Sequence, residues 1–105
     1  MRYTAILVPG QDEVSVLVPA LPGCFSAGRT RDEAVAKSRE AIRGWVAAET
    51  EQGRAPLTET PAVLIDGVKR ALEIIEETRQ AGEIPGDRGY ELELVTVHAP
   101  HPVPA

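Results

Sequence analysis

The sequence predicts an α+β fold in two layers, in which an antiparallel three-stranded meander and a C-terminal strand carry one or two helices on one face. Two observations predict it. Short apolar, β-branched runs separated by proline and glycine fill the first 28 residues, and a last alternating run covers residues 90–97. Between them, residues 31–52 and 61–81 place apolar side chains at spacings of three and four, as helices do. Strands, then helices, then a strand is an order typical of α+β domains.

The first three strands are separated by turn-forming residues. Residues 2–8 alternate at first and then become apolar throughout, as in a strand buried on much of both faces. The polar segment 9–13 leads to residues 14–18, whose valines alternate along an extended strand. Residues 24–27 form a shorter third strand. These runs predict a hairpin and one further strand.

A corner joins the second and third strands. Pro19 and Pro22 end the strand because neither residue has a backbone N–H to donate. Gly23 tolerates a positive φ, so Pro22 and Gly23 form the centre of a tight turn.

Start and stop signals bound the first helix. Gly28 ends the third strand, and Thr30 with Glu33 three residues later forms a capping box. The helix then runs from Arg31 to about residue 52, where Gly53 ends it.

A second helix and a last strand complete the chain. Thr60 and Pro61 are a favourable N-cap and first helical residue, and the helix extends to about residue 81. The alternating strand 90–97 is expected beside the first strand. Residues 1–97 are therefore expected to form one domain with the second helix inserted, followed by a proline-rich tail at 98–105.

The segment from the second strand to the first helix carries a specific motif. This segment resembles the HicB-like antitoxins. The shared features, in order, are a strand, P-x-L-P-G-C, a few small residues, G-x-T and an acidic helix start. The resemblance covers about residues 1–55, and the second helix departs from it. It implies a partial ribonuclease H-like fold and binding to a small RNA-cleaving toxin. The matching residues, taken as structural, are Pro19, Leu21, Pro22, Gly23, Cys24, Gly28, Thr30 and Glu33, followed by Ala34.

Composition narrows the possible partners. The net charge of −5, with one Phe, one Trp and two Tyr, is unfavourable for binding nucleic acid, which needs cations and stacking surfaces. The surface of the second helix is acidic on balance, so direct DNA binding is not expected. A basic protein suits an acidic domain better. A single cysteine and the lack of a long apolar run indicate a cytoplasmic protein with no membrane segment, and a chain this small would benefit from homo-oligomerisation.

No residue pattern indicates catalysis. Two-metal phosphodiester cleavage requires converging carboxylates, and residues 1–10 contain none. His98 and His101 lie among prolines, which prevent a helix. Two histidines are also too few ligands for a zinc site, which usually needs three or four protein ligands. Cys24 has no base beside it in the sequence. We therefore expect no enzymatic activity, no metal and no cofactor.

The expected function is that of a non-catalytic antitoxin that binds and neutralises a small basic, HicA-like ribonuclease. Its carboxylates would occupy the positions of RNA phosphates on the toxin. Two alternatives remain: an orphan oligomeric scaffold or ligand-binding domain of the same fold, and a degenerate ribonuclease H-like nuclease. The candidate contacts with the partner are Asp12, Glu13, Asp32, Glu40, Glu91 and Glu93.

Overall fold

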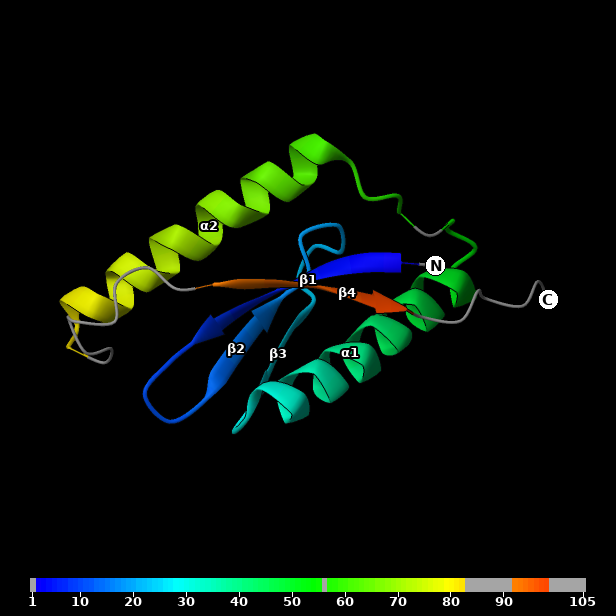
Figure 1. Cartoon of the computed structure of the whole chain (residues 1–105). Helices are drawn as coiled ribbons and strands as arrows, with labels where there is room; N and C mark the ends of the chain where they lie inside the picture. Colours follow the sequence, from blue (N-terminus) through cyan, green and yellow to red (C-terminus); the bar gives the residue numbers. More distant parts are fainter. Residues whose placement is uncertain (1, 56, 83–91, 99–105) are drawn as a thin grey trace.

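A computed structural model describes residues 2–55, 57–82 and 92–98 of the chain. Its elements follow the order β-β-β-α-α-β (Figure 1). The strands are β1 (Arg2–Pro9), β2 (Val14–Leu17), β3 (Phe25–Gly28) and β4 (Glu93–His98), and the helices are α1 (Arg31–Glu51) and α2 (Pro61–Gln80).

The four strands form one antiparallel sheet of order β3-β2-β1-β4. β4 pairs with β1 from Arg2↔His98 to Leu7↔Glu93, so the last strand lies beside the first, as predicted. Ile6 lies opposite Leu17 on one side and Leu94 on the other. β1 is therefore a central strand, and β3 and β4 are the edges.

Helix α1 covers one face of the sheet. Tyr3, Ala5 and Leu7 alternate along β1 and pack in one buried cluster with Ile42 and Val46 of α1. Alternate strand residues point to the same face, so these three side chains all face α1. Their cluster is the larger of the two buried clusters and forms the main core.

Helix α2 covers the opposite face, so the sheet is the middle of three layers (Figure 1). Ile6 and Val8 of β1 and Leu17 of β2 pack against Ala71 and Ile75 of α2. The α+β class and the sheet are confirmed, and α1 lies on one face as expected, but the second helix does not share that face. The reason is that β1 is buried on both of its faces and needs apolar cover on each.

The linker between the helices is attached to the start of β1, where β2 does not pair with that strand. The Glu59 carboxylate accepts hydrogen bonds from the Thr4 backbone N–H at 2.7 Å and from Thr4 Oγ1 at 2.9 Å. The Tyr3 hydroxyl donates to the Leu57 carbonyl at 2.9 Å. The pairing of β2 with β1 begins only at Ile6, so Glu59 satisfies an N–H that β2 does not reach.

Candidate partner-binding surface

Carboxylates from three separate elements gather at one end of the sheet. Pro9 lies opposite Val14, which in turn lies opposite Gly28, so the β1–β2 turn and the start of α1 are at the same end. Glu93 begins β4 opposite Leu7, near that end. We call these residues the acidic end: Asp12, Glu13, Asp32, Glu33 and Glu93.

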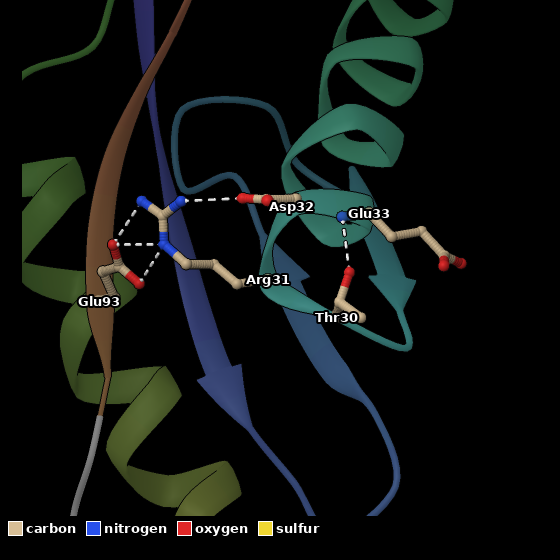
Figure 2. Close-up of polar contacts among 5 residues, drawn as sticks. All are labelled: Thr30, Arg31, Asp32, Glu33 and Glu93. Carbon is tan, nitrogen blue, oxygen red and sulfur yellow. Dashed lines mark hydrogen bonds and ion pairs between the residues drawn. The ribbon is translucent and has the colours of Figure 1, made fainter.

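The first turn of α1 presents two of these carboxylates. Thr30 is extended, with φ −124° and ψ 165°, and its Oγ1 accepts a hydrogen bond from the Glu33 N–H at 3.1 Å. The Glu33 carboxylate points away from Thr30 (Figure 2), so the cap leaves it available to solvent. The side chain of Asp32 is 95% exposed. Both acids also lie where the helix dipole favours negative charge.

Arg31 joins α1 to β4 through Glu93 (Figure 2). Its Nε lies 2.8 Å and 2.9 Å from the two Glu93 carboxylate oxygens, and its Nη2 lies 2.7 Å from Oε1. Its Nη1 reaches Asp32 Oδ1 at 3.4 Å. Of the predicted contacts, Glu93 is therefore engaged within the chain, whereas Asp32 is held only loosely.

This ion pair should make stability depend on pH on the acid side. The hydrogen bonds from Arg31 hold the pKa of Glu93 below its usual value, with burial opposing the shift. A lowered folded-state pKa gives stability that is present above the unfolded pKa of about 4.3 and is lost as pH falls through the folded pKa. We expect Glu93→Gln to reduce the drop in the urea midpoint between pH 7 and pH 3.

Glu49 is a second carboxylate with a lowered pKa, through its hydrogen bonds from Arg54, so the Glu93→Gln variant keeps some acid dependence from that pair. Glu13→Gln removes an exposed carboxylate from the turn and serves as the matched control. An acid dependence that is identical in Glu93→Gln and the wild type would contradict the role given to the Arg31–Glu93 pair.

The remaining predicted contacts are not all brought together. Asp12 and Glu13 are exposed in the β1–β2 turn. Glu40 is exposed on α1, eight residues or about 12 Å beyond Asp32 along the helix, and lies 3.9 Å from Lys37. Glu91 lies outside the described residues.

In the structure, the C-terminal end of α2 also lies near the acidic end. Thr78 lines a recess of about 330 Å³ together with residues 10–13 and Ser15. The last turns of α2 therefore lie beside the β1–β2 turn. They carry Glu73 and Glu77, both paired with Arg70. Sequence reasoning missed them because it considered only one face of the sheet, covered by one or two helices.

The corner between β2 and β3 is held by backbone hydrogen bonds between residues three apart in the sequence. Leu21 N–H donates to the Val18 carbonyl at 3.0 Å, and Cys24 N–H donates to the Leu21 carbonyl at 2.9 Å. Gly23 has φ +79°, and Trp45 Nε1 of α1 donates to the Pro22 carbonyl at 3.0 Å.

The buried residues of the corner fill the core. Leu21 and Cys24 are 1% and 5% exposed. Burial raises the pKa of the Cys24 thiol, which keeps it protonated and poorly nucleophilic at neutral pH.

An apolar cleft of about 330 Å³ lies between the corner and α2. Its lining includes Leu17 and Phe25 from the sheet and Val63 and Arg70 from α2. Phe25 is 66% exposed. This cleft lies on the β3 side of α2, whereas the acidic end lies at the end of the sheet that carries the β1–β2 turn. The two are therefore separate surfaces.

Neither a metal centre nor a membrane span is found in the part of the chain that the structure describes. Among residues 2–55, 57–82 and 92–98, no three His, Cys, Asp or Glu side chains are grouped so as to hold a metal ion. Neither of the two described helices combines the length and the apolar character needed to cross a membrane. The surface offers charge and apolar recesses, which are the means of binding another molecule.

This architecture is that of solved antitoxins. The fold matches the structure described as "HicA3 and HicB3 toxin-antitoxin complex", with a TM-score of 0.56 and 18% identity over 95% of this chain and 99% of that chain. It also matches the N-terminal domain of the Burkholderia pseudomallei antitoxin HicB, with a TM-score of 0.54 and 25% identity over 93% of this chain and 99% of that one.

Sequence comparison specifies the family. The family model described as the HicB-like antitoxin of bacterial toxin-antitoxin systems matches residues 3–79. The match extends past residue 55 and includes nearly all of α2, so the expectation that the second helix departs from the family is wrong. The chain therefore belongs to the HicB-like antitoxin family. It is also 47% identical over 47 residues to the UPF0150 protein Ta0767 of Thermoplasma acidophilum, an alignment that covers 44% of this chain and 68% of that protein.

Proposed function

We propose that this protein is a non-catalytic antitoxin that binds a small basic, HicA-like ribonuclease and blocks its RNA site. The observation that carries the proposal is the acidic end, where exposed Asp12, Glu13 and Asp32 project from elements fixed to one sheet. Family membership and the likeness to a toxin–antitoxin complex support the same function.

The physical basis is competition for a cationic surface. A ribonuclease that binds RNA presents cations to phosphates, and carboxylates held in a fixed arrangement can occupy the same positions. The turn after β1 and the first turn of α1 are anchored to the core through β1, β3 and the Thr30 cap. The acidic end is thus preorganised, which lowers the entropy lost on binding.

The proposal includes the setting in which the protein acts. A net charge of −5 disfavours direct binding to nucleic acid, and it steers a basic partner toward the surface. We propose that the antitoxin works in the cytoplasm, as a single domain that also self-associates. The candidate contacts are Asp12, Glu13 and Asp32 first, with Glu33 beside them.

The test is complex formation with the toxin candidate encoded next to this gene. We expect a stoichiometric complex after co-expression, and loss of the toxin's RNA cleavage when the antitoxin is added. The triple variant Asp12→Asn, Glu13→Gln, Asp32→Asn should weaken binding about tenfold or more, which corresponds to about 1.4 kcal/mol. Calorimetric titration at low salt would measure it.

The matched control removes three negative charges elsewhere. Glu40→Gln, Glu51→Gln and Asp66→Asn are exposed positions on the two helices and change the net charge by the same amount. Glu40 was a candidate contact from the sequence, but it lies about 12 Å from Asp32 along α1, outside the acidic end. We expect this control to change the affinity by less than about threefold. Equal weakening by both variants would show that net charge, and not the acidic end, is responsible. A toxin that forms no complex would overturn the proposed function itself.

A further inference from the structure

Strand β3 is an edge of the sheet, and half of its backbone groups point outward. The Val18 N–H donates to the Cys24 carbonyl at 3.2 Å, and these two residues lie next to the Leu17–Phe25 pair in the register of β2 with β3. Pairs with and without mutual backbone hydrogen bonds alternate along antiparallel strands. Phe25 and Ala27 therefore direct their N–H and C=O groups away from β2. Among the described residues, no strand lies on the outer side of β3.

This edge has little protection against pairing. Edge strands are commonly protected by charge, proline, a bulge or a short length. The segment Phe25–Gly28 reads Phe-Ser-Ala-Gly, pairs with β2 in an unbroken register and carries neither charge nor proline. Its short length of four residues remains as a protection. An extended segment of another protein can add to such an edge and gain main-chain hydrogen bonds from it.

The Phe25 side chain stands at one end of this edge, beside the apolar cleft. Phe25 lies opposite Leu17, which packs against α2, so its side chain points to the α2 face of the sheet. It is 66% exposed. The cleft beside it is lined by Pro19 and Leu21 from the corner and by Val63 from α2. A residue of an added strand that lies opposite Phe25 would point to the same face, where the cleft can receive an apolar side chain.

The other end of this edge meets the acidic end. Gly28 lies three residues, or about 10 Å, beyond Phe25 along the strand. The first turn of α1 follows, and its Glu33 carboxylate points away from the cap (Figure 2). The five carboxylates of the acidic end outnumber the two nearby cations, Arg29 and Arg31. A strand that extends past Gly28 therefore reaches a negatively charged surface.

We propose that β3 pairs with an extended segment of the basic ribonuclease that the proposed function assigns to this antitoxin, so the inference rests on that function. The segment would form backbone hydrogen bonds with Phe25 and Ala27. An apolar side chain of the segment would fill the cleft beside Phe25, and its cations would meet the acidic end. One partner would thus contact both surfaces, through the strand that joins them.

Charge favours this occupant over a second copy of the chain. A second copy has a net charge of −5 and would bring its own acidic end to this surface, so the two chains would repel each other there. A basic segment gains ion pairs at the acidic end, and these also steer it toward the edge. The cleft and the exposed ring of Phe25 add an apolar contact of the kind that is enriched at the centre of protein interfaces.

The first test measures affinity by calorimetric titration with the purified basic protein encoded next to this gene. Phe25→Ala should weaken binding about tenfold or more, because it removes the aromatic contact beside the cleft. This loss should persist at high salt, which screens exposed charges and should reduce the effect of the Asp12, Glu13 and Asp32 triple variant. Ile65→Ala is the matched control, because Ile65 is 55% exposed and does not line the cleft. It should change the affinity by less than about threefold.

The second test concerns the backbone of β3. Ala27→Pro removes one outward N–H and leaves the pairing with β2 intact, because proline is tolerated on an edge whose N–H side faces solvent. It should weaken binding about fivefold or more, whereas Ala27→Val keeps the N–H and should bind like the wild type. In hydrogen exchange, the amides of Phe25 and Ala27 should exchange rapidly in the chain alone and become protected in the complex. Far-ultraviolet circular dichroism would show that each variant is folded.

The outcomes separate this inference from the proposed function. A complex to which folded Phe25→Ala and Ala27→Pro variants bind as tightly as the wild type, or in which both amides stay unprotected, would overturn the pairing at β3 and leave the proposed function standing. Protection of both amides that rises with the concentration of the chain alone would assign the edge to a second copy and would also overturn the inference. A wild type that forms no complex would overturn the proposed function, and this inference with it.

Discussion

Replacement of Gly28 by alanine is expected to lower the free energy of unfolding by about 3 kcal/mol, the upper part of the range for overpacking. A Cβ at this buried position would lie 2.4 Å from the Ala34 backbone nitrogen and 2.8 Å from the Ala34 Cα. Backbone atoms in the first turn of a helix cannot move aside as a flexible side chain can. Either α1 must shift away from β3 or the end of β3 must leave the sheet. Urea unfolding would measure the loss.

The matched control is Gly44→Ala, in the middle of the same helix. Gly44 is exposed, and an added Cβ there meets nothing within 4 Å. Alanine has the higher helix propensity, so this variant should gain about 1 kcal/mol. The same chemical change is thus expected to have opposite signs at two positions. An unfolding free energy of Gly28→Ala equal to that of the wild type would contradict the close approach of α1 to the end of β3.

Replacement of Gly67 by alanine is expected to destabilise the attachment of α2 to the sheet. The added Cβ would lie 2.3 Å from Cγ and 2.5 Å from Cβ of Pro19, whose ring is rigid. Overpacking costs about 1–3 kcal/mol, and the gain in helix propensity returns about 1 kcal/mol. A net loss of about 1–2 kcal/mol should therefore appear in urea unfolding, with the helix content of the folded state unchanged.

A double-mutant cycle isolates this contact. Pro19→Gly removes both atoms that the new methyl group would meet, although it has a cost of its own. In that background Gly67→Ala should become neutral or stabilising. A cost of Gly67→Ala that is the same in both backgrounds would show that α2 does not pack against Pro19 at Gly67.

Features set by neighbouring residues could be predicted from the sequence. The turn at Pro22 and Gly23, the cap at Thr30 and the start of α2 at Pro61 each depend on a few adjacent residues, and the structure has them at those places. The position of β4 beside β1 followed from the order of the elements.

Features that depend on distant residues could not be predicted. The apolar stripe of α2 does not indicate which face of the sheet the helix covers. The apolar run in β1 indicated burial on both faces, and Ala5, Ile6, Leu7 and Val8 are all buried, but the run does not show which helix covers which face. The hydrogen bonds between Glu59 and Thr4 join residues 55 positions apart, and those between Arg31 and Glu93 join residues 62 apart. No local pattern marks such pairs, and the second removes Glu93 from the set of freely available carboxylates.

The place of β4 in the sheet also has a consequence for how the protein folds. Pairing Arg2 with His98 closes a loop that contains almost the whole chain, and the entropy of that closure must be lost before the contact is gained. The residues of the β1–β2 hairpin and its corner all lie within the first 28 of the chain. Until residues 92–98 are added, the apolar strand β1 has one side unpaired. The central strand of the finished domain is thus the exposed edge of the incomplete one.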